Sequence, residues 1–209
     1  MKAATINETT KKNCIRLLQD PDYVRDNVYI GFQRASNATL IKRPGELPGS
    51  EQYLYVRGTD GDLPWHVRLQ NVLLEDVYLT EAEAYANTCA EGRTVIHSLP
   101  NLLLEIGGPD IKEEAKDGPQ MYVITNPQRA FGAAQILDRK VIRAFFHKQV
   151  PGCEKLIVIP SSIHECILVP LQEGEDHDIN AFHMMVQEVN ASSVDAKEQL
   201  ADRCFEMRL

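Results

Sequence analysis

The densest group of chemically capable side chains in this sequence is the run Ser161-Ser162-Ile163-His164-Glu165, which Cys166 follows directly. A serine, a histidine and a carboxylate are the residue types of a hydrolytic triad, in which the histidine takes a proton from the attacking hydroxyl. In an extended strand alternate residues share a face, so Ser162 and His164 would lie side by side while Glu165 pointed the opposite way. The sequence also lacks the G-x-S-x-G turn that exposes a nucleophilic serine. Ser162, His164 and Glu165 are therefore only candidates for catalysis.

A structural role for this run is the interpretation we favour. Serine hydroxyls at a chain reversal bond backbone groups, and a neighbouring histidine and glutamate can form hydrogen bonds at the rim of a core. Ligand binding is the second interpretation, and catalysis is the third. The candidate binding residues are Ser161, Ser162, His164, Glu165 and Asn126.

The other groups of functional residues have ordinary structural explanations. The acidic run 175–178 with His183 offers possible zinc or manganese ligands, but an acidic loop before a helix is usually solvated. Cys166 lies on an apolar strand, where a small core residue is more common than a nucleophile. The sequence has no glycine-rich phosphate loop, no dinucleotide fingerprint and no CxxC pair. We therefore expect no metal and no cofactor.

Aromatic residues offer one further candidate surface. Trp65 with Tyr53, Tyr55 and Tyr78 could form a patch for a partner, although packing in a core is the interpretation we favour.

Composition limits the class of protein. The chain has 209 residues, of which 44% are hydrophobic and 25% charged, as in an ordinary soluble globular protein. Its net charge of −8 argues against nonspecific nucleic-acid binding, which needs a basic face. No apolar run approaches the roughly 20 residues that span a bilayer, and residues 1–14 lack the apolar core of a signal peptide. The five cysteines are scattered, which is typical of free thiols in a reducing compartment. We predict a cytoplasmic protein with no membrane partner and leave its oligomeric state open.

The segments around the serine–histidine run predict a strand, a corner and a second strand. Apolar runs at 156–159 and 163–169 are split by Pro160-Ser161-Ser162. A further strand is expected at 121–125, ending at Asn126-Pro127. Residues 128–137 are ambiguous: the alanines favour a helix, whereas Gly132 and the preceding turn favour the return strand of a hairpin, which we prefer.

Two amphipathic helices are expected in the second half of the chain. Asp138 predicts the start of a helix at 139–149, and Asp178 predicts the start of another that ends near 190. A last short helix is expected from about 195. The apolar face of the first comprises Val141, Ile142, Phe145 and Phe146, and that of the second comprises Ile179, Phe182, Val186 and Val189.

The first half of the chain predicts smaller elements. A helix at 5–18 ends at Asp20-Pro21, and short strands follow at 28–32 and 39–41. The stretch 43–51, rich in proline and glycine, predicts a boundary between an N-terminal appendage (1–50) and a main domain (51–209).

Within the main domain, an antiparallel strand pair is expected at 53–56 and 66–74. Thr80 with Glu83 predicts a capping box for a helix through about 90. Strands and helices cluster rather than alternate, so the predicted class is α+β, a mostly antiparallel sheet with helices packed on one face.

Five strings in the chain resemble a domain-of-unknown-function family found mainly in anaerobic gut bacteria. They occur in the family's order between about residues 53 and 209, and PSSIHE (160–165) is the most specific part. The resemblance implies a shared α+β fold for this region and implies no reaction, because the family has no established one. The strings are LTEAEAYANT (79–88), MYVITNPQRAFGAAQIL (121–137), LIVIPSSIHECILVP (156–170), MVQEVNASSV (185–194) and LADRCF (200–205).

The function that we predict is that of a non-enzymatic intracellular binding or regulatory protein. The missing catalytic and cofactor motifs motivate this prediction, and the acidic balance suits a protein partner. A partner tied to a mobile element or phage is one hypothesis. The alternative is a small hydrolase that uses the corner Ser161–Glu165.

Overall fold

The computed structural model describes residues 8–70, 81–102, 120–172, 174 and 178–209. The chain forms two compact units. The first comprises residues 1–30, 37–43 and 53–88, and the second comprises residues 31–36, 44–52 and 89–209. All candidate residues of the serine–histidine run, together with Asn126, belong to the second unit.

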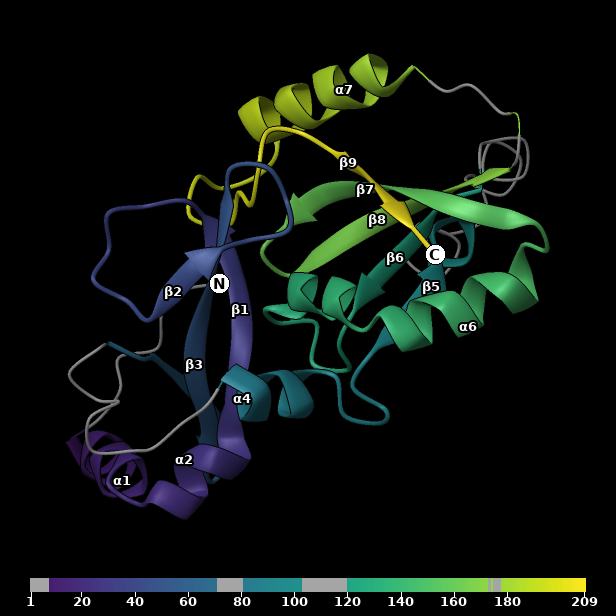
Figure 1. The fold of residues 1–209 in the computed structure, drawn as a ribbon. Coiled ribbons are helices and arrows are strands. Elements are labelled where there is room, and N and C mark those ends of the chain that lie inside the picture. Colours follow the sequence, from purple (N-terminus) through teal and green to yellow (C-terminus); the bar gives the residue numbers. More distant parts are fainter. Residues whose placement is uncertain (1–7, 71–80, 103–119, 173, 175–177) are drawn as a thin grey trace. The chain divides into compact units, whose positions relative to one another are not determined.

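A four-stranded antiparallel sheet contains the first four strands. Three of them follow the order β1-β3-β2 (Figure 1), and β4 pairs with β3. The pairing of β3 with β4 confirms the predicted strand pair, and residues 71–74 lie outside the described residues. The elements of this half are α1 (Glu8–Leu18), α2 (Pro21–Asn27), β1 (Val28–Arg34), β2 (Lys42–Pro44), β3 (Ser50–Asp60), β4 (Leu63–Arg68) and α4 (Glu81–Thr88).

Helix α2 is an element that the sequence interpretation missed. The Asp20 carboxylate accepts hydrogen bonds from the backbone N–H groups of Asp22 and Tyr23, and Pro21 occupies the first turn. An aspartate cap followed by proline is a strong helix start, because proline needs no hydrogen-bond partner there. Asp20-Pro21 therefore separates two helices rather than ending helical structure. The proposed cap Thr80 lies outside the described residues.

The segment proposed as a linker contains buried residues. The strand expected at 39–41 begins instead at Lys42, as β2. Between β2 and β3 the chain turns with Leu47 only 1% exposed, and Ser50 and Glu51 are also buried. The boundary between 1–50 and 51–209 stays a prediction.

The second sheet has five antiparallel strands in the order β5-β6-β8-β7-β9. Two antiparallel sheets together with helices make the protein an α+β fold, as predicted. The strands of the second sheet are β5 (Val95–Ser98), β6 (Tyr122–Thr125), β7 (Cys153–Ser162), β8 (Glu165–Gln172) and β9 (Phe205–Arg208).

Helices α6 (Arg139–Gln149) and α7 (Ile179–Ser192) cover opposite faces of this sheet (Figure 1). The Tyr122 ring meets the rings of Phe145 and Phe146 of α6, with centroids 5.3 and 5.1 Å away. Side chains on the opposite face of the sheet, including Ile157, form a core cluster with Val186 of α7. The helices were expected on one face. The unbroken buried run 156–159 of β7 explains the difference, because a strand buried on both faces has no polar alternation.

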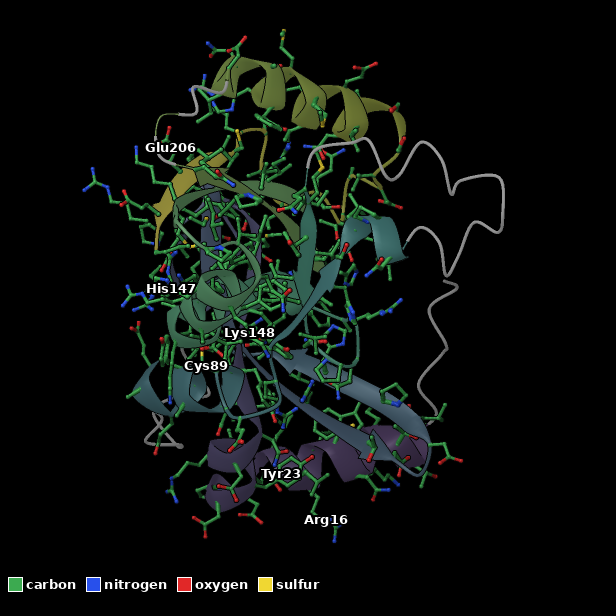
Figure 2. The ribbon with its side chains drawn as sticks, turned by 90° about the vertical axis from the view of Figure 1, so that its right-hand side faces the viewer. Arg16, Tyr23, Cys89, His147, Lys148 and Glu206 are labelled. Carbon is green, nitrogen blue, oxygen red and sulfur yellow. The ribbon has the colours of Figure 1, made fainter. Side chains whose placement is uncertain are left out.

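The N-terminal caps predicted for α6 and α7 are both present. The Asp138 carboxylate accepts from the N–H of Val141, and the Asp178 carboxylate accepts from the N–H of Asn180. Phe146 is fully buried, as expected of the apolar face, whereas Phe145 is only half-buried and Val141 is 37% exposed. His147 and Lys148 lie on the exposed side of α6 near its last turn (Figure 2).

Two further predictions of secondary structure are wrong. Residues 132–137 form a 3₁₀ helix rather than a return strand. The helix expected from about 195 is instead a short turn, and the chain then continues into the edge strand β9.

Candidate functional site

The serine–histidine run forms the tip of the β7–β8 hairpin. Ser162 pairs with Glu165, so Ile163 and His164 are the two turn residues. Pro160 pairs with Cys166, which leaves Ser161 as an extra residue on β7 and makes the tip a β-bulge. The predicted corner Pro160–Ser162 is therefore the end of β7, and the chain reverses two residues later. Ser162 accordingly has Glu165, not His164, as its cross-strand neighbour.

The Ser162 hydroxyl stabilises the turn. Its Oγ accepts a hydrogen bond from the backbone N–H of His164 at 3.1 Å. Such a bond from a residue two positions later is a common way for serine to close a turn. This contact supports the structural interpretation of Ser162.

His164 joins the hairpin tip to the segment that follows β6. Its ring Nδ1 accepts from the backbone N–H of Phe131 at 3.1 Å, and its carbonyl accepts from the Thr125 hydroxyl at 2.9 Å. Because the lone pair of Nδ1 is engaged, the neutral ring carries its proton on Nε2. Nε2 faces a carboxylate oxygen of Glu198 at 3.7 Å. In this state neither ring nitrogen of His164 is free to take a proton from Ser162.

Asn126 shapes the loop that supplies the Phe131 N–H group. Its side-chain amide donates to the Ala130 carbonyl at 2.7 Å, and its Oδ1 accepts from the Ala130 N–H at 3.2 Å. The loop also includes two non-glycine residues with positive φ, Arg129 (50°) and Phe131 (56°). The buried Asn126 amide thus compensates for a backbone that L-residues rarely adopt.

Gly132 allows the loop to approach the hairpin tip closely. A Cβ atom at this position would lie 2.3 Å from the Thr125 hydroxyl oxygen, 2.6 Å from the His164 carbonyl oxygen and 2.7 Å from the Asn126 nitrogen. Two of these three atoms are backbone atoms, which cannot rotate away. The next residues, Ala133 and Ala134, are fully buried. The small residues therefore let the 3₁₀ helix pack closely against the end of β6 and the hairpin tip.

A second segment contacts the other side of the tip. The Ile163 N–H donates to the Glu198 carbonyl at 2.8 Å, and the Ile163 carbonyl accepts from the Ala133 N–H at 3.4 Å. The turn is thus bonded both to the loop after β6 and to the segment before β9. The sequence interpretation named Asn126 and His164 but missed their partners. These are Ala130 for Asn126, and Thr125, Phe131 and Glu198 for His164.

The remaining candidates of the run differ in exposure. Cys166 is fully buried, and burial, together with the neighbouring Glu165 charge, raises the pKa of its thiol. A protonated, buried thiol is not a nucleophile. Ser161 and Glu165 are half-exposed, and within the described part of the chain their side chains make no hydrogen bond or ion pair.

The other sequence candidates fall outside this site. Within the residues described, no three metal-binding side chains meet, and positions 175–177 are not among them. His183 Nδ1 lies 3.0 Å from the sulfur of buried Cys204. Tyr53, Tyr55 and Trp65 are buried, as core packing predicts, and Tyr78 lies outside the described residues.

Helix α7 presents a second candidate surface. Its inner side includes buried Val186, while Met184, Met185 and Val189 are 64%, 44% and 42% exposed. Residues three and four apart share a helix face, so these three side chains lie together with Ala181 and Glu188. We call Ala181, Met184, Met185, Glu188 and Val189 the outer face of α7. Val189 was expected on the buried stripe; Asn190 is buried instead and donates to the Ala201 carbonyl.

Comparison with known proteins places this architecture in a family. Residues 66–207 match the family of unknown function DUF5688. The chain belongs to DUF5688. The match confirms the predicted membership of a family of unknown function. It includes the loop after β6, the β7–β8 hairpin and α7, so both candidate surfaces lie in the DUF5688 region. No curated protein and no solved structure matches the chain. Within the part of the chain that the structure describes, no helix is long and apolar enough to cross a membrane.

Proposed function

We propose that this DUF5688 protein is a non-enzymatic binding protein that engages a protein partner through the outer face of α7. The observation that carries the proposal is the exposure of Met184, Met185 and Val189 on one side of a helix whose other side is in a core. Exposed apolar groups that cluster, rather than occur singly, are typical of interaction sites. Methionine is common at such sites because its flexible thioether adapts to different partners.

The geometry of the hairpin tip supports a binding protein over an enzyme. The Ser162 hydroxyl is engaged with the His164 N–H group, and His164 Nδ1 is engaged with the Phe131 N–H group. A nucleophilic serine needs a histidine nitrogen that can accept its proton. The hydrogen bonds at the tip instead support a role in fixing the turn.

Affinity purification from the native host tests the proposal. The full-length wild type is compared with a Met184→Ser/Met185→Ser variant, and Val141→Ser on α6 is the matched control because Val141 is also an exposed apolar residue. We expect a stoichiometric protein that binds the wild type and the control but not the α7 variant. The purified partner should reproduce this difference in a two-component titration. Equal binding to all three proteins would contradict a role for α7.

A small hydrolase at the hairpin tip is the second candidate. The Glu165 carboxylate favours the hydrolase. It is half-exposed, it belongs to the cross-strand neighbour of Ser162, and it makes no hydrogen bond or ion pair within the described residues. The test is a panel of ester, amide and phosphodiester substrates with the wild type and the Ser162→Ala, His164→Ala and Glu165→Gln variants. We expect no activity that depends on these side chains. An activity lost in all three variants, with unchanged melting temperatures, would establish the hydrolase.

We also propose that the protein acts in the cytoplasm, where thiols stay reduced. The five cysteines, Cys14, Cys89, Cys153, Cys166 and Cys204, are all free, and this observation supports the proposal. Loss of stability on addition of a reductant would contradict it.

A further inference from the structure

The acidic residues of the chain are concentrated around α7. The whole chain has 30 acidic and 22 basic residues, yet residues 173–202 contain eight acidic residues and a single basic one, Lys197. Most of the net charge of −8 therefore comes from this segment, and the rest of the chain is close to balance. A strongly acidic segment surrounds the outer face of α7 in the sequence.

Described acidic side chains border the apolar part of that face. Asp178 precedes the first turn, Glu188 lies between Met184 and Val189 on the face, and Asp195 follows the last turn. All three are exposed, and no ion pair of theirs occurs within the described residues. Side chains of α7 project away from the sheet in Figure 2. The outer face thus combines exposed apolar side chains with the carboxylate of Glu188, and Asp178 and Asp195 add negative charge near its two ends.

We infer that the partner of this face is a basic amphipathic helix of another protein; the inference rests on the proposed function. Apolar side chains on such a helix would pack on Met184, Met185 and Val189, and lysine or arginine side chains would meet Glu188 and the acidic ends of α7. The 14 residues of α7 extend for about 21 Å, so a partner helix of about four turns covers the face.

Charge argues against the other occupants of an apolar helix face. A second copy of this chain would bring like charges of Glu188 and its neighbours together, which is unfavourable. An anionic membrane surface or a nucleic acid would be repelled for the same reason. A positively charged helix satisfies both the apolar and the acidic parts of the face.

Fluorescence anisotropy with model peptides tests the inference. The full-length protein is titrated with a labelled amphipathic peptide of about 18 residues made of leucine and lysine, and with a peptide in which glutamate replaces lysine. We expect binding of the lysine peptide only. Raising NaCl from about 50 mM to about 500 mM should weaken it about tenfold or more, because salt screens exposed charge.

Variants separate the outer face from general charge attraction. Glu188→Lys and the Met184→Ser/Met185→Ser variant should each weaken binding of the lysine peptide about tenfold. This factor corresponds to a loss of about 1.4 kcal/mol of binding free energy. Glu91→Lys makes the same charge change at another exposed site and should leave binding unchanged. Circular dichroism of each variant checks that it is folded, and the surface change Glu188→Lys remains informative if the methionine variant is not.

Three outcomes would overturn the inference. Equal weakening by Glu188→Lys and Glu91→Lys would indicate attraction without a site. Dimerisation of the free protein that the methionine variant abolishes would assign the face to a second copy. Failure of the lysine peptide to bind, with retention of a native partner that needs Met184 and Met185, would reject the basic helix and leave the proposed function intact.

Discussion

At the scale of single residues, His164 and Gly132 carry most of the contacts of the hairpin tip. His164 presents an acceptor, Nδ1, to one segment and a carbonyl to another, while Gly132 lets those segments approach. Each of these contacts involves a backbone group. The side chains around the tip therefore act by forming hydrogen bonds with the main chain and by setting the distance between its segments. We therefore expect substitutions here to change the stability of the fold.

We predict that His164→Ala lowers the free energy of unfolding by about 1–3 kcal/mol, because the Phe131 N–H group loses its acceptor. Thermal and urea unfolding measure the change. His147→Ala, an exposed histidine on α6, is the control and should have little effect. His164→Asn supplies a carbonyl oxygen near the position of Nδ1 and should recover part of the loss. An unchanged melting temperature for His164→Ala would contradict the structural role.

We predict that Gly132→Ala destabilises the protein by about 1–3 kcal/mol, because the added methyl group overlaps Thr125, Asn126 and His164 atoms. Removing the Thr125 hydroxyl with Thr125→Ala should not rescue the variant, since the Asn126 nitrogen and the His164 carbonyl remain. Urea unfolding of the single and double variants makes the comparison. Full rescue in the double variant would show that the backbone can move away from the new methyl group.

At the scale of elements, helix α6 depends on two aromatic side chains with different burial. Phe146 is fully buried against Tyr122, and Phe145 is half-buried. We expect Phe146→Ala to cost about 3–5 kcal/mol and Phe145→Ala clearly less. Val141→Ala, on the exposed side, should change the free energy of unfolding little. Similar losses for Phe145 and Phe146 would mean that α6 packs differently.

Helix α1 is bonded to the end of β3 through Asp60. Hydrogen bonds from Thr10 and then from Asn13 lower the pKa of the Asp60 carboxyl. A lowered pKa in the folded state means that the ionised carboxylate stabilises the fold above its ordinary pKa, and that this contribution disappears as the pH falls through the lowered value.

Asp60→Asn should therefore lower the melting temperature at neutral pH, and the difference from the wild type should shrink as the pH approaches about 3. The neighbouring exposed Asp62 has no such bonds among the described residues, so Asp62→Asn is the matched control. Melting curves between these pH values provide the measurement. A difference that grows towards acid pH would have the wrong sign for this linkage.

How much the sequence can predict depends on how local the determining contacts are. Helix 139–149 follows from its Asp138 cap and its apolar spacing, and the strands of the β7–β8 hairpin follow from their composition, so these were predicted. Helix α2 carried an equally local signal in Asp20-Pro21. In contrast, the conformation of 132–137 depends on the close approach of Gly132 to His164, which is 32 positions away in the sequence.

The candidate site shows the same limit. The serine–histidine run and Asn126 are visible in the sequence because their residue types are distinctive. Their partners are backbone atoms of Phe131 and Ala130 and a carboxylate of Glu198, and no residue type signals a backbone partner. The outer face of α7 was missed because Val189 fits the apolar stripe, whereas the structure buries the amide of Asn190 in its place.

At the scale of the whole molecule, the central strands of the second sheet should be accessible only after unfolding. Cys166 of β8 is fully buried and burial raises the pKa of its thiol, whereas Cys89 is partly exposed. We predict that iodoacetamide at about pH 8 modifies Cys89 first and leaves Cys166 unmodified until the protein is denatured. Mass spectrometry of peptides sampled over time measures both. Early modification of Cys166 would indicate local opening of the hairpin.

The two-residue turn between β7 and β8 has a consequence for the order of folding. Closing so short a loop costs little chain entropy, and isolated hairpins form within about 1–10 μs. Strand β6 must instead find β8 across a long stretch of chain, from Ile124 to Cys166, and β9 must return to β7 from Phe205 to Val158. We therefore expect the β7–β8 hairpin to act as the nucleus on which the outer strands assemble. Substitutions in its strands should then slow refolding, while those in β5 and β9 should mainly accelerate unfolding.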